Sequence, residues 1–291
     1  WTRDACGSQA STKTLKINYC CTYWGCEQDS PNVFVDKVLA AGYEGIEISL
    51  PPTPETFTPH FLKELEGIRL NKPNFIFIAQ HLTSPGTDTV EQYIRKMEKN
   101  LLELTSYNPT FINSHTGKDF YSFDENCSVI EAALNISQKT GVRILHETHR
   151  GRFSYHAASL LPYLQKFPEL ELVGDLSHFC TVSESLLADQ QHILQEIIPH
   201  MAHLHARVGH EQGPQVNNPF APEWQEHLAV FLAWWKEIIN HRKNTSKELF
   251  TITPEFGPAP YMPAMPFTQE PLSNQWELNC TMKDYLINQL N

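Results

Sequence analysis

The chain has 291 residues and a mass of 33.4 kDa, which fits two average domains or a single α/β barrel of about 250 residues. Hydrophobic residues make up 41% of the chain and charged residues 19%, so the chain can bury a large core and is neither disordered nor fibrous. Lys and Arg total 22 against 33 Asp and Glu, and the formal charge of -11 works against binding to nucleic acid or an anionic membrane.

The sequence contains no run of about 18 apolar residues, so we expect a soluble protein without a membrane-spanning helix. It begins at Trp1 rather than Met, so we expect an upstream segment, with any targeting signal, to be missing. The seven cysteines form no paired CxxC motifs and are expected to be mostly free thiols. We therefore expect a cytoplasmic protein, while four Asn-x-Ser/Thr sequons leave secretion open: Asn126, Asn135, Asn244 and Asn279.

From Leu15 onward, short β-rich runs alternate with longer amphipathic runs, which is typical of repeated βα units. Eight strands are predicted, at Leu15–Cys20, Gly45–Leu50, Asn74–Gln80, Thr110–His115, Val142–Glu147, Glu171–Asp175, Ala202–Arg207 and Phe250–Glu255. Helices are predicted after them, at Asn32–Ala41, Pro59–Leu70, Thr89–Leu104, Asn126–Thr140, Ala157–Phe167, Ser185–Ile198, Pro222–Asn240 and within Asn274–Leu290.

Start and stop signals agree with this periodicity. Ser30-Pro31 is a typical helix start, and Ala41-Gly42 and Thr140-Gly141 are typical helix ends. No linker-like segment divides the chain, so we predict one α/β domain over residues 1–291, a single (β/α)8 TIM barrel with residues 1–14 as an N-terminal extension. No GxGxxG or GxxxxGK[ST] motif follows a strand, so the alternative of an open nucleotide-binding sheet lacks its usual evidence.

In such barrels the chemistry lies at the carboxyl ends of the strands, and here those ends are polar. The side chains concerned are Glu47, His81, His115, Glu147, Asp175, His205, Arg207 and Glu255. Each has a structural explanation on its own: Asp175, for example, is a typical helix N-cap, and a single histidine is often only a hydrogen-bonding residue. Together they predict a metal site, because buried carboxylates and imidazoles are costly unless they are paired or metal-bound.

Strands five to eight would supply one nitrogen and three carboxylate ligands, from Glu147, Asp175, His205 and Glu255. This set suits one divalent metal ion such as Mn²⁺, Mg²⁺, Co²⁺ or Zn²⁺, with open positions for substrate oxygens.

At these residues the chain resembles the xylose isomerase-like TIM-barrel superfamily, in particular its sugar phosphate isomerase/epimerase branch. The resemblance runs from Tyr19 to Glu255 and is carried by four motifs, Ala41-Gly42-Tyr43-Glu44-Gly45-Ile46-Glu47, Asp175-Leu176-Ser177-His178, His205-Ala206-Arg207-Val208-Gly209 and Pro254-Glu255-Phe256-Gly257. It implies that Glu147, Asp175, His205 and Glu255 hold the metal ion.

The resemblance also implies that Glu147 and Glu255 form the acid/base pair and that His178 contacts the substrate. In one respect the chain departs from the ketose 3-epimerases, which carry a Glu and an Arg where Val208 and Glu211 stand here. An arginine lies instead at Arg207, two residues after the strand-seven histidine. The resemblance therefore does not specify 3-epimerisation.

We predict a metal-dependent isomerase or epimerase of a keto-sugar or related polyol. Further substrate contacts are expected from Trp24, Glu47, His81, His115, His149 and Arg207. The segments His210–Ala221 and Gly257–Pro266 follow strands seven and eight and are expected to form a lid or a subunit contact. The expected partner is a small sugar-like molecule, with no nucleic acid and no membrane, and homo-oligomerisation stays open.

Three alternatives remain at this point. A dehydratase of an inosose or dehydroshikimate-like substrate would use the same metal and base to expel a hydroxyl group. An abasic-site endonuclease shares the barrel, but it needs a basic surface for DNA, which the charge of -11 opposes. A sugar-binding barrel without turnover is the third alternative.

Overall fold

The computed structural model describes residues 15–51, 54–83, 86–245 and 249–290. The predicted N-terminal extension, residues 1–14, lies outside this part of the chain, and so does Cys6. The other six cysteines are free, as predicted. No helix in the described ranges is both long and apolar enough to cross a membrane.

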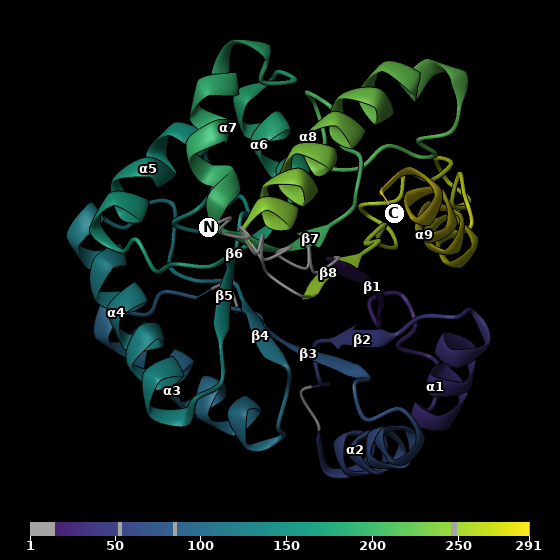
Figure 1. Ribbon diagram of the computed structural model, residues 1–291, viewed down its shortest axis with the longest axis horizontal. Coiled ribbons are helices and arrows are strands. Elements are labelled where there is room, and N and C mark those ends of the chain that lie inside the picture. Colours follow the sequence, from purple (N-terminus) through teal and green to yellow (C-terminus); the bar gives the residue numbers. More distant parts are fainter. Residues whose placement is uncertain (1–14, 52–53, 84–85, 246–248, 291) are drawn as a thin grey trace, which may run out of the picture.

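Eight parallel strands form a closed barrel, in which each strand pairs with the next and β8 pairs with β1 (Figure 1). The strands are β1 (Lys16–Thr22), β2 (Gly45–Ile48), β3 (Ile76–His81), β4 (Phe111–Ser114), β5 (Ile144–Glu147), β6 (Leu172–Gly174), β7 (Met201–His205) and β8 (Leu249–Thr253). Each predicted strand is present, and its ends differ from the prediction by two residues at most. The prediction of a single (β/α)8 TIM barrel is confirmed.

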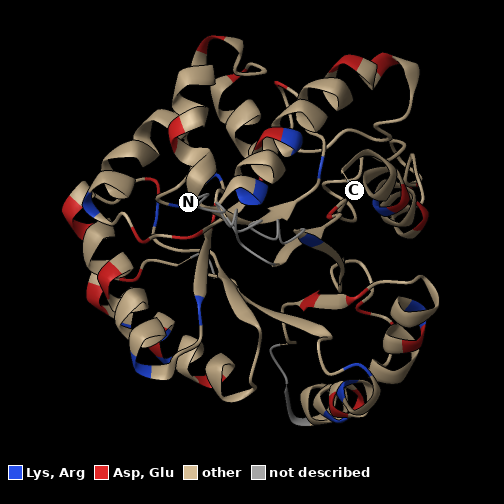
Figure 2. Ribbon diagram, in the orientation of Figure 1, with Lys and Arg blue, Asp and Glu red and all other residues tan. Residues whose placement is uncertain are grey.

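Helices surround the barrel and cover the outer faces of its strands (Figure 1). They are α1 (Pro31–Ala40), α2 (Pro54–Asn71), α3 (Val90–Ser106), α4 (Phe123–Thr140), α5 (Ala157–Lys166), α6 (Leu176–Ser183), α7 (Gln191–Ile197), α8 (Gln225–Asn244) and α9 (Gln275–Leu290). Contacts between α9 and the first βα unit complete the ring, since Nζ of Lys37 lies 4.5 Å from the ring centre of Trp276. Charged residues lie mainly on these outer helices, with acidic residues in excess (Figure 2).

The region after β6 differs from the predicted helix Ser185–Ile198. Asp175 caps α6 immediately after β6, so a helix begins at Leu176, nine residues before the predicted start at Ser185. Glu184 and Leu187 then adopt left-handed backbone conformations, with φ of 47° and 55°. These conformations end α6 and delay α7 to Gln191, and neither residue type signals such a turn in a sequence.

The predicted helix boundaries at Ser30, Gly42 and Gly141 are confirmed. Ser30 is the N-cap of α1, and Pro31 is its first residue. Gly42 and Gly141 follow α1 and α4 with φ of 74° and 73°, the left-handed conformation that glycine adopts without a steric penalty.

The barrel interior changes from apolar to polar along its axis. A cluster made only of strand residues is apolar: Cys20, Ile76, Ile78, Phe111, Leu145, Val173 and Ala202. Nearer the carboxyl ends of the strands, the buried side chains include Glu47, Asn113, His203 and His205. Because alternate residues of a strand share one face, His203 and His205 lie on the same face of β7.

Candidate active site

Four residues from neighbouring strands meet at the carboxyl end of the barrel. Glu147 is the last residue of β5, Asp175 follows β6, His205 ends β7 and Glu255 lies two residues beyond β8. One ligand atom from each of the four lies within 4.8 Å of the others, and all four residues are buried. The residues for which the sequence predicts metal ligation therefore form one compact group.

The two ring nitrogens of His205 have different surroundings. Nε2 lies 2.9 Å from Oε1 of Glu47, whereas Nδ1 lies 2.8 Å from Oε2 of Glu255. Nδ1 is buried and makes no hydrogen bond with any described residue. A metal-binding histidine typically donates its other ring N–H to a carboxylate, which leaves one nitrogen free for the ion. The surroundings of His205 fit a metal ligand of this kind.

Three carboxylates around one imidazole require positive charge within the group. Burial lowers the pKa of His205, but the neighbouring carboxylates, first that of Glu255, outweigh burial and raise its pKa well above the usual range. In the metal-free protein these carboxylates therefore favour a proton on His205, while Arg207 is the cation that pairs with Asp175. A divalent ion would replace that proton, and oxygen donors with one imidazole are ligands that suit such ions.

The carboxyl groups of Glu147 and Glu255 differ in their tendency to bind a proton. Burial raises the pKa of Glu147, but the neighbouring imidazoles of His115 and His205 outweigh it and bring the pKa well below the usual range. Burial raises the pKa of Glu255 above its usual range, despite the opposing charge of His205. Two carboxyl groups whose pKa values are pushed apart can serve as a base and an acid in one site.

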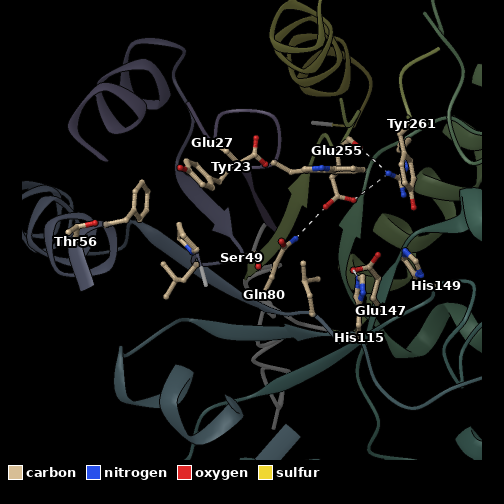
Figure 3. Close-up of a pocket in the computed structure, with 16 residues that line it drawn as sticks. Tyr23, Glu27, Ser49, Thr56, Gln80, His115, Glu147, His149, Glu255 and Tyr261 are labelled. Atoms are coloured by element: carbon tan, nitrogen blue, oxygen red, sulfur yellow. Dashed lines mark hydrogen bonds and ion pairs between the residues drawn. The ribbon is translucent and has the colours of Figure 1, made fainter. Parts of the chain in front are cut away.

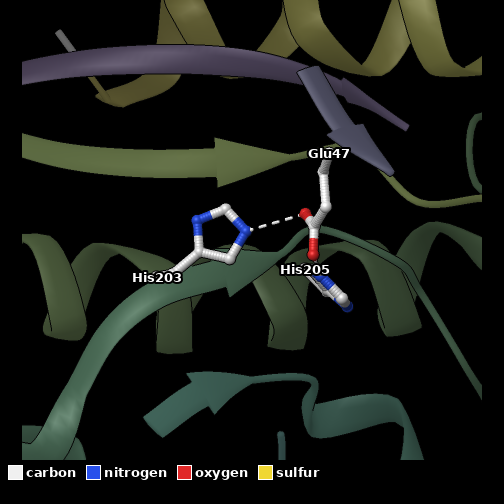
Figure 4. Close-up of side chains that lie close together, drawn as sticks. All are labelled: Glu47, His203 and His205. Atoms are coloured by element: carbon white, nitrogen blue, oxygen red, sulfur yellow. Dashed lines mark hydrogen bonds and ion pairs between the residues drawn. The ribbon is translucent and has the colours of Figure 1, made fainter. Parts of the chain in front are cut away.

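The carboxylate of Glu47 points towards the rings of His203 and His205 in the barrel interior, where Glu47 is fully buried (Figure 4). Its carboxylate accepts hydrogen bonds from five side chains, His203, His205, Asn113, Gln80 and Thr253. Burial raises the pKa of Glu47, but His205 and His203 outweigh burial and lower it well below the usual range. The sequence assigns Glu47 to substrate binding, whereas the structure places its carboxylate against the nitrogen of His205 that faces away from Glu255.

Two amide side chains connect the carboxylates, and sequence reasoning missed both. Nδ2 of Asn113 lies 3.0 Å from Oε1 of Glu47 and 2.8 Å from Oε2 of Glu147. Nε2 of Gln80 lies 3.1 Å from Oε1 of Glu47 and 3.4 Å from Oε1 of Glu255. Their position near strand ends was visible in the sequence, since Gln80 directly precedes His81 and Asn113 lies within a predicted strand, but nothing in the sequence indicated which carboxylates they join.

Asp175 serves two structural purposes at once. Its Oδ1 accepts hydrogen bonds from the backbone N–H and the hydroxyl group of Ser177, which caps α6 as the N-cap explanation predicts. Its Oδ2 accepts a hydrogen bond from Nη2 of Arg207, which is buried. The same Nη2 lies 3.1 Å from Nε2 of His178, so His178 helps to fix the position of the guanidinium group.

A cavity of about 710 Å³ opens above this group (Figure 3). Glu147, Glu255 and four of the predicted substrate contacts line it, namely Trp24, His115, His149 and Arg207. The remaining three predicted contacts, Glu47, His81 and His178, are buried and are not among the lining residues. Nδ1 of His81 instead lies 2.9 Å from Oγ of Ser114.

The two long segments after β7 and β8 are joined to each other beside the cavity. Nε2 of Gln215 donates to the carbonyl of Gly257, and the N–H of Gly257 donates to Oε1 of Gln215. Tyr261, in the second segment, lines the cavity, and its ring meets that of Trp24 edge to face at 4.8 Å. The segment thus contributes directly to the cavity wall, which the sequence did not indicate for Tyr261.

The closed parallel barrel and the buried ligand group at the carboxyl ends of its strands define a TIM-barrel protein with a candidate metal site. More particularly, the chain has the fold of the xylose isomerase-like TIM barrels, which confirms at the level of the fold the resemblance seen in the sequence. No protein-family model matches the sequence, and no curated protein is detectably similar to it.

Three solved structures illustrate the likeness. A probable 3-DHS dehydratase involved in petrobactin synthesis, from Bacillus anthracis, is 16% identical, with 94% of this chain and 100% of that chain covered and a TM-score of 0.63. A xylose isomerase-like TIM-barrel protein from Mycobacterium smegmatis, in complex with magnesium, is 10% identical, with 97% and 98% covered and a TM-score of 0.62. A D-tagatose 3-epimerase-like protein is 17% identical, with 94% and 98% covered and a TM-score of 0.58.

Proposed function

We propose that the protein is a divalent-metal-dependent isomerase or epimerase that moves a proton on a carbon beside the carbonyl group of a sugar-like substrate. The observation that carries this proposal is that Glu147 and Glu255 belong to one candidate ligand group and line one cavity, with pKa values shifted in opposite directions. A bound divalent ion would act as a Lewis acid that polarises the carbonyl group and stabilises the negative charge on its oxygen.

Glu147 is the base in this proposal because it stays ionised. Asn113 and His115 both contact its Oε2, at 2.8 Å and 3.1 Å, and fix the direction of the carboxylate. Glu255 is the acid in this proposal: burial raises its pKa in the metal-free protein, and it lines the same cavity as Glu147, from which it can return a proton to carbon. Return to the opposite face of the same carbon gives an epimer, and return to the neighbouring carbon gives aldose–ketose isomerisation.

In this proposal, the polar side chains around these carboxyl groups bind the substrate. His115, His149 and Arg207 line the cavity next to Glu147 and Glu255, and each can bind a hydroxyl group. The guanidinium group of Arg207 can also bind a carboxylate.

A second candidate function is dehydration of an inosose or dehydroshikimate-like substrate. It is favoured by the likeness to the probable 3-DHS dehydratase and by the Val208 and Glu211 positions, which depart from the 3-epimerase pattern. The same base would remove the proton, and a hydroxyl group would leave from the neighbouring carbon. Nucleic acid remains an unfavourable partner, because the formal charge of the chain is -11.

The test is incubation of the metal-loaded protein with ketoses, keto acids and inososes in D₂O. We expect deuterium to enter carbon in at least one substrate, and we expect Glu147→Gln and Glu255→Gln to lose this exchange by about 100-fold or more, the size of a lost acid/base group. Glu66→Gln, an exposed position on α2, is the matched control and should retain exchange. Loss of water would give an enone that absorbs ultraviolet light, and this product would favour the dehydratase. Full exchange in either active-site variant would contradict the proposed acid/base pair.

A further inference from the structure

The cavity has two chemically different halves. Its polar half comes from the ends of β4 to β8, where His115, Glu147, His149, Arg207 and Glu255 lie. The other half follows β1 to β3 and includes the first turn of α2, and its apolar side chains form what we call the apolar wall: Tyr23, Leu50, Pro51, Phe57 and Leu82. Because β1, β2 and β3 are adjacent in the barrel, the wall occupies one side of the cavity.

Figure 3 shows this separation directly, with Tyr23 and Thr56 on one side of the cavity and Glu147 and His149 on the other. The ring of Tyr23 lies 5.1 Å from that of Phe57 and 4.9 Å from that of Phe34. These contacts hold the two aromatic residues of the wall in place. The apolar wall is therefore a preformed surface.

A sugar ring at the polar half would not need the apolar wall. Trp24 and Tyr261 lie beside Arg207, whose guanidinium carbon is 5.9 Å and 4.8 Å from their ring centres. These two rings can stack on the C–H face of a sugar next to the carboxyl groups. The apolar wall is an additional surface, supplied by different residues, although Tyr23 and Trp24 are neighbours after β1.

Much of the hydrogen-bonding capacity of the apolar half is already used within the protein. The polar side chains that line it are Glu27, Ser49, Thr56 and Gln80, and Nε2 of Gln80 already donates to Glu47 and Glu255. Both carboxylate oxygens of Glu27 lie 3.0 Å from the backbone N of Gly25, so part of its hydrogen-bonding capacity is already used. A ligand with hydroxyl groups along its whole length would lose hydrogen bonds to water on entering this half.

The size of the cavity also favours a ligand that is larger than a single sugar ring. A volume of about 710 Å³ lies within the range of roughly 300 to 1,000 Å³ that is typical of sites for drug-sized ligands. A single sugar ring is much smaller than such a ligand and would occupy only the polar half.

We propose that the substrate is a sugar or polyol that carries an apolar substituent of about the size of an aromatic ring. The substituent lies on the apolar wall while the reacting carbon lies at Glu147 and Glu255. The position of the reacting carbon rests on the proposed function, whereas the position of the substituent rests on the wall alone.

The experiment compares matched methyl and phenyl glycosides of glucose, galactose, mannose and xylose by calorimetric titration of the Mn²⁺-loaded protein. The members of each pair differ only in the group that would reach the apolar wall. We expect at least one phenyl glycoside to bind about tenfold or more tightly than its methyl partner, because burial of a phenyl ring on apolar side chains is favourable. Equal affinities within every pair, or no binding by any glycoside, would overturn the proposal.

Two variants test whether the wall produces the preference. Phe57→Ala removes one ring of the wall, and Leu50→Gln makes a partly exposed position polar with little loss of packing. In each, the ratio of the affinity for the phenyl glycoside to that for the methyl glycoside should fall to about threefold or less. Phe120→Ala, at a position that is 75% exposed and does not line the cavity, should keep the full preference. A preference that persists in both cavity variants would overturn the proposal.

Calorimetry needs no turnover, so this inference and the proposed function can fail separately. A phenyl preference without deuterium exchange into any substrate would support the wall and contradict the proposed function. Deuterium exchange into free ketoses without a phenyl preference would support the proposed function. It would contradict the proposal that the apolar wall binds a substituent of the substrate.

Discussion

Oε1 of Glu47 lies 2.9 Å from Nε2 of His205, while Nδ1 of the same ring faces Glu255 at the edge of the cavity. This contact joins β2 to β7 across the interior of the barrel. Glu47 cannot easily rotate away, because His203 and Thr253 also donate hydrogen bonds to its other oxygen. Glu47 therefore fixes both the orientation of the His205 ring and the nitrogen that carries its proton.

We predict that Glu47→Gln weakens metal binding by about 10- to 100-fold, the range typical when a metal-binding histidine loses its carboxylate partner. The amide has nearly the size of the carboxylate but lacks the charge that orients His205. Calorimetric titration with Mn²⁺ measures the effect. Glu44→Gln is the matched control, because Glu44 is partly exposed, pairs with Lys16 and should leave metal affinity unchanged. Equal affinities for Glu47→Gln and the parent protein would rule out the orienting role.

Metal binding should also stabilise the fold, because the ion would add positive charge to a buried group that holds three carboxylates, of which only that of Asp175 pairs closely with Arg207. At a free Mn²⁺ concentration about 100 times the Kd, we expect the free energy of unfolding to rise by about 2.7 kcal/mol, and a chelator should reverse the gain. Urea unfolding with and without metal measures it. Asp175→Asn should lose most of the gain, and Asp36→Asn, at an exposed position on α1, should retain it. A gain of the same size in both variants would place the metal elsewhere.

The barrel and the ligand group could be predicted because both depend on patterns local in the sequence. Each strand is a short apolar run followed by a polar residue, and the parallel barrel brings those residues to one edge. Glu147, Asp175 and Glu255 each close a predicted strand, and His205 lies two residues before the end of another, so their meeting follows from the fold.

The supporting residues could not be predicted in the same way, because their roles depend on which atoms they meet. Asn113 and Gln80 are uncharged amides, and only the structure shows them joining two carboxylates. In the sequence, Glu47 lies near the end of a predicted strand, as the residues that line the cavity do. In the structure, however, its carboxylate contacts His205 inside the barrel. Tyr261 lies in a long segment without regular structure, which gives no periodic signal.

Breaking the contact between Arg207 and Asp175 should destabilise the metal-free protein. Both side chains are buried, so Arg207→Gln leaves a carboxylate without its cation, which typically costs about 3 to 5 kcal/mol. Arg143→Gln is the matched control, because its pair with Glu171 is partly exposed and should contribute about 0 to 1 kcal/mol.

Urea unfolding in the presence of a chelator measures both values. Adding Mn²⁺ should restore more stability to Arg207→Gln than to the parent protein, because the ion then supplies the missing positive charge beside Asp175. Similar losses of unfolding free energy for Arg207→Gln and Arg143→Gln would show that the buried ion pair contributes no more to stability than the partly exposed one.

His81 should make the protein less stable in mild acid. Burial lowers the pKa of His81 from 6.5 to about 3, and its Nδ1 contacts Oγ of Ser114. Because the pKa is lower in the folded state, the unfolded chain binds more protons below pH 6.5, and stability falls as the pH falls from there towards 3. One such group contributes a slope of about 1.4 kcal/mol per pH unit in that window.

His81→Gln removes this titration while keeping a side chain that can bond to Ser114. We expect the difference in unfolding free energy between the parent protein and His81→Gln to move by about 1.4 kcal/mol in favour of the variant when the pH falls from about 5.5 to about 4.5. Urea unfolding at the two pH values measures the change. His60→Gln, at an exposed position on α2, should show no such movement. If the difference stayed constant between the two pH values, His81 would carry the same charge in the folded and unfolded states.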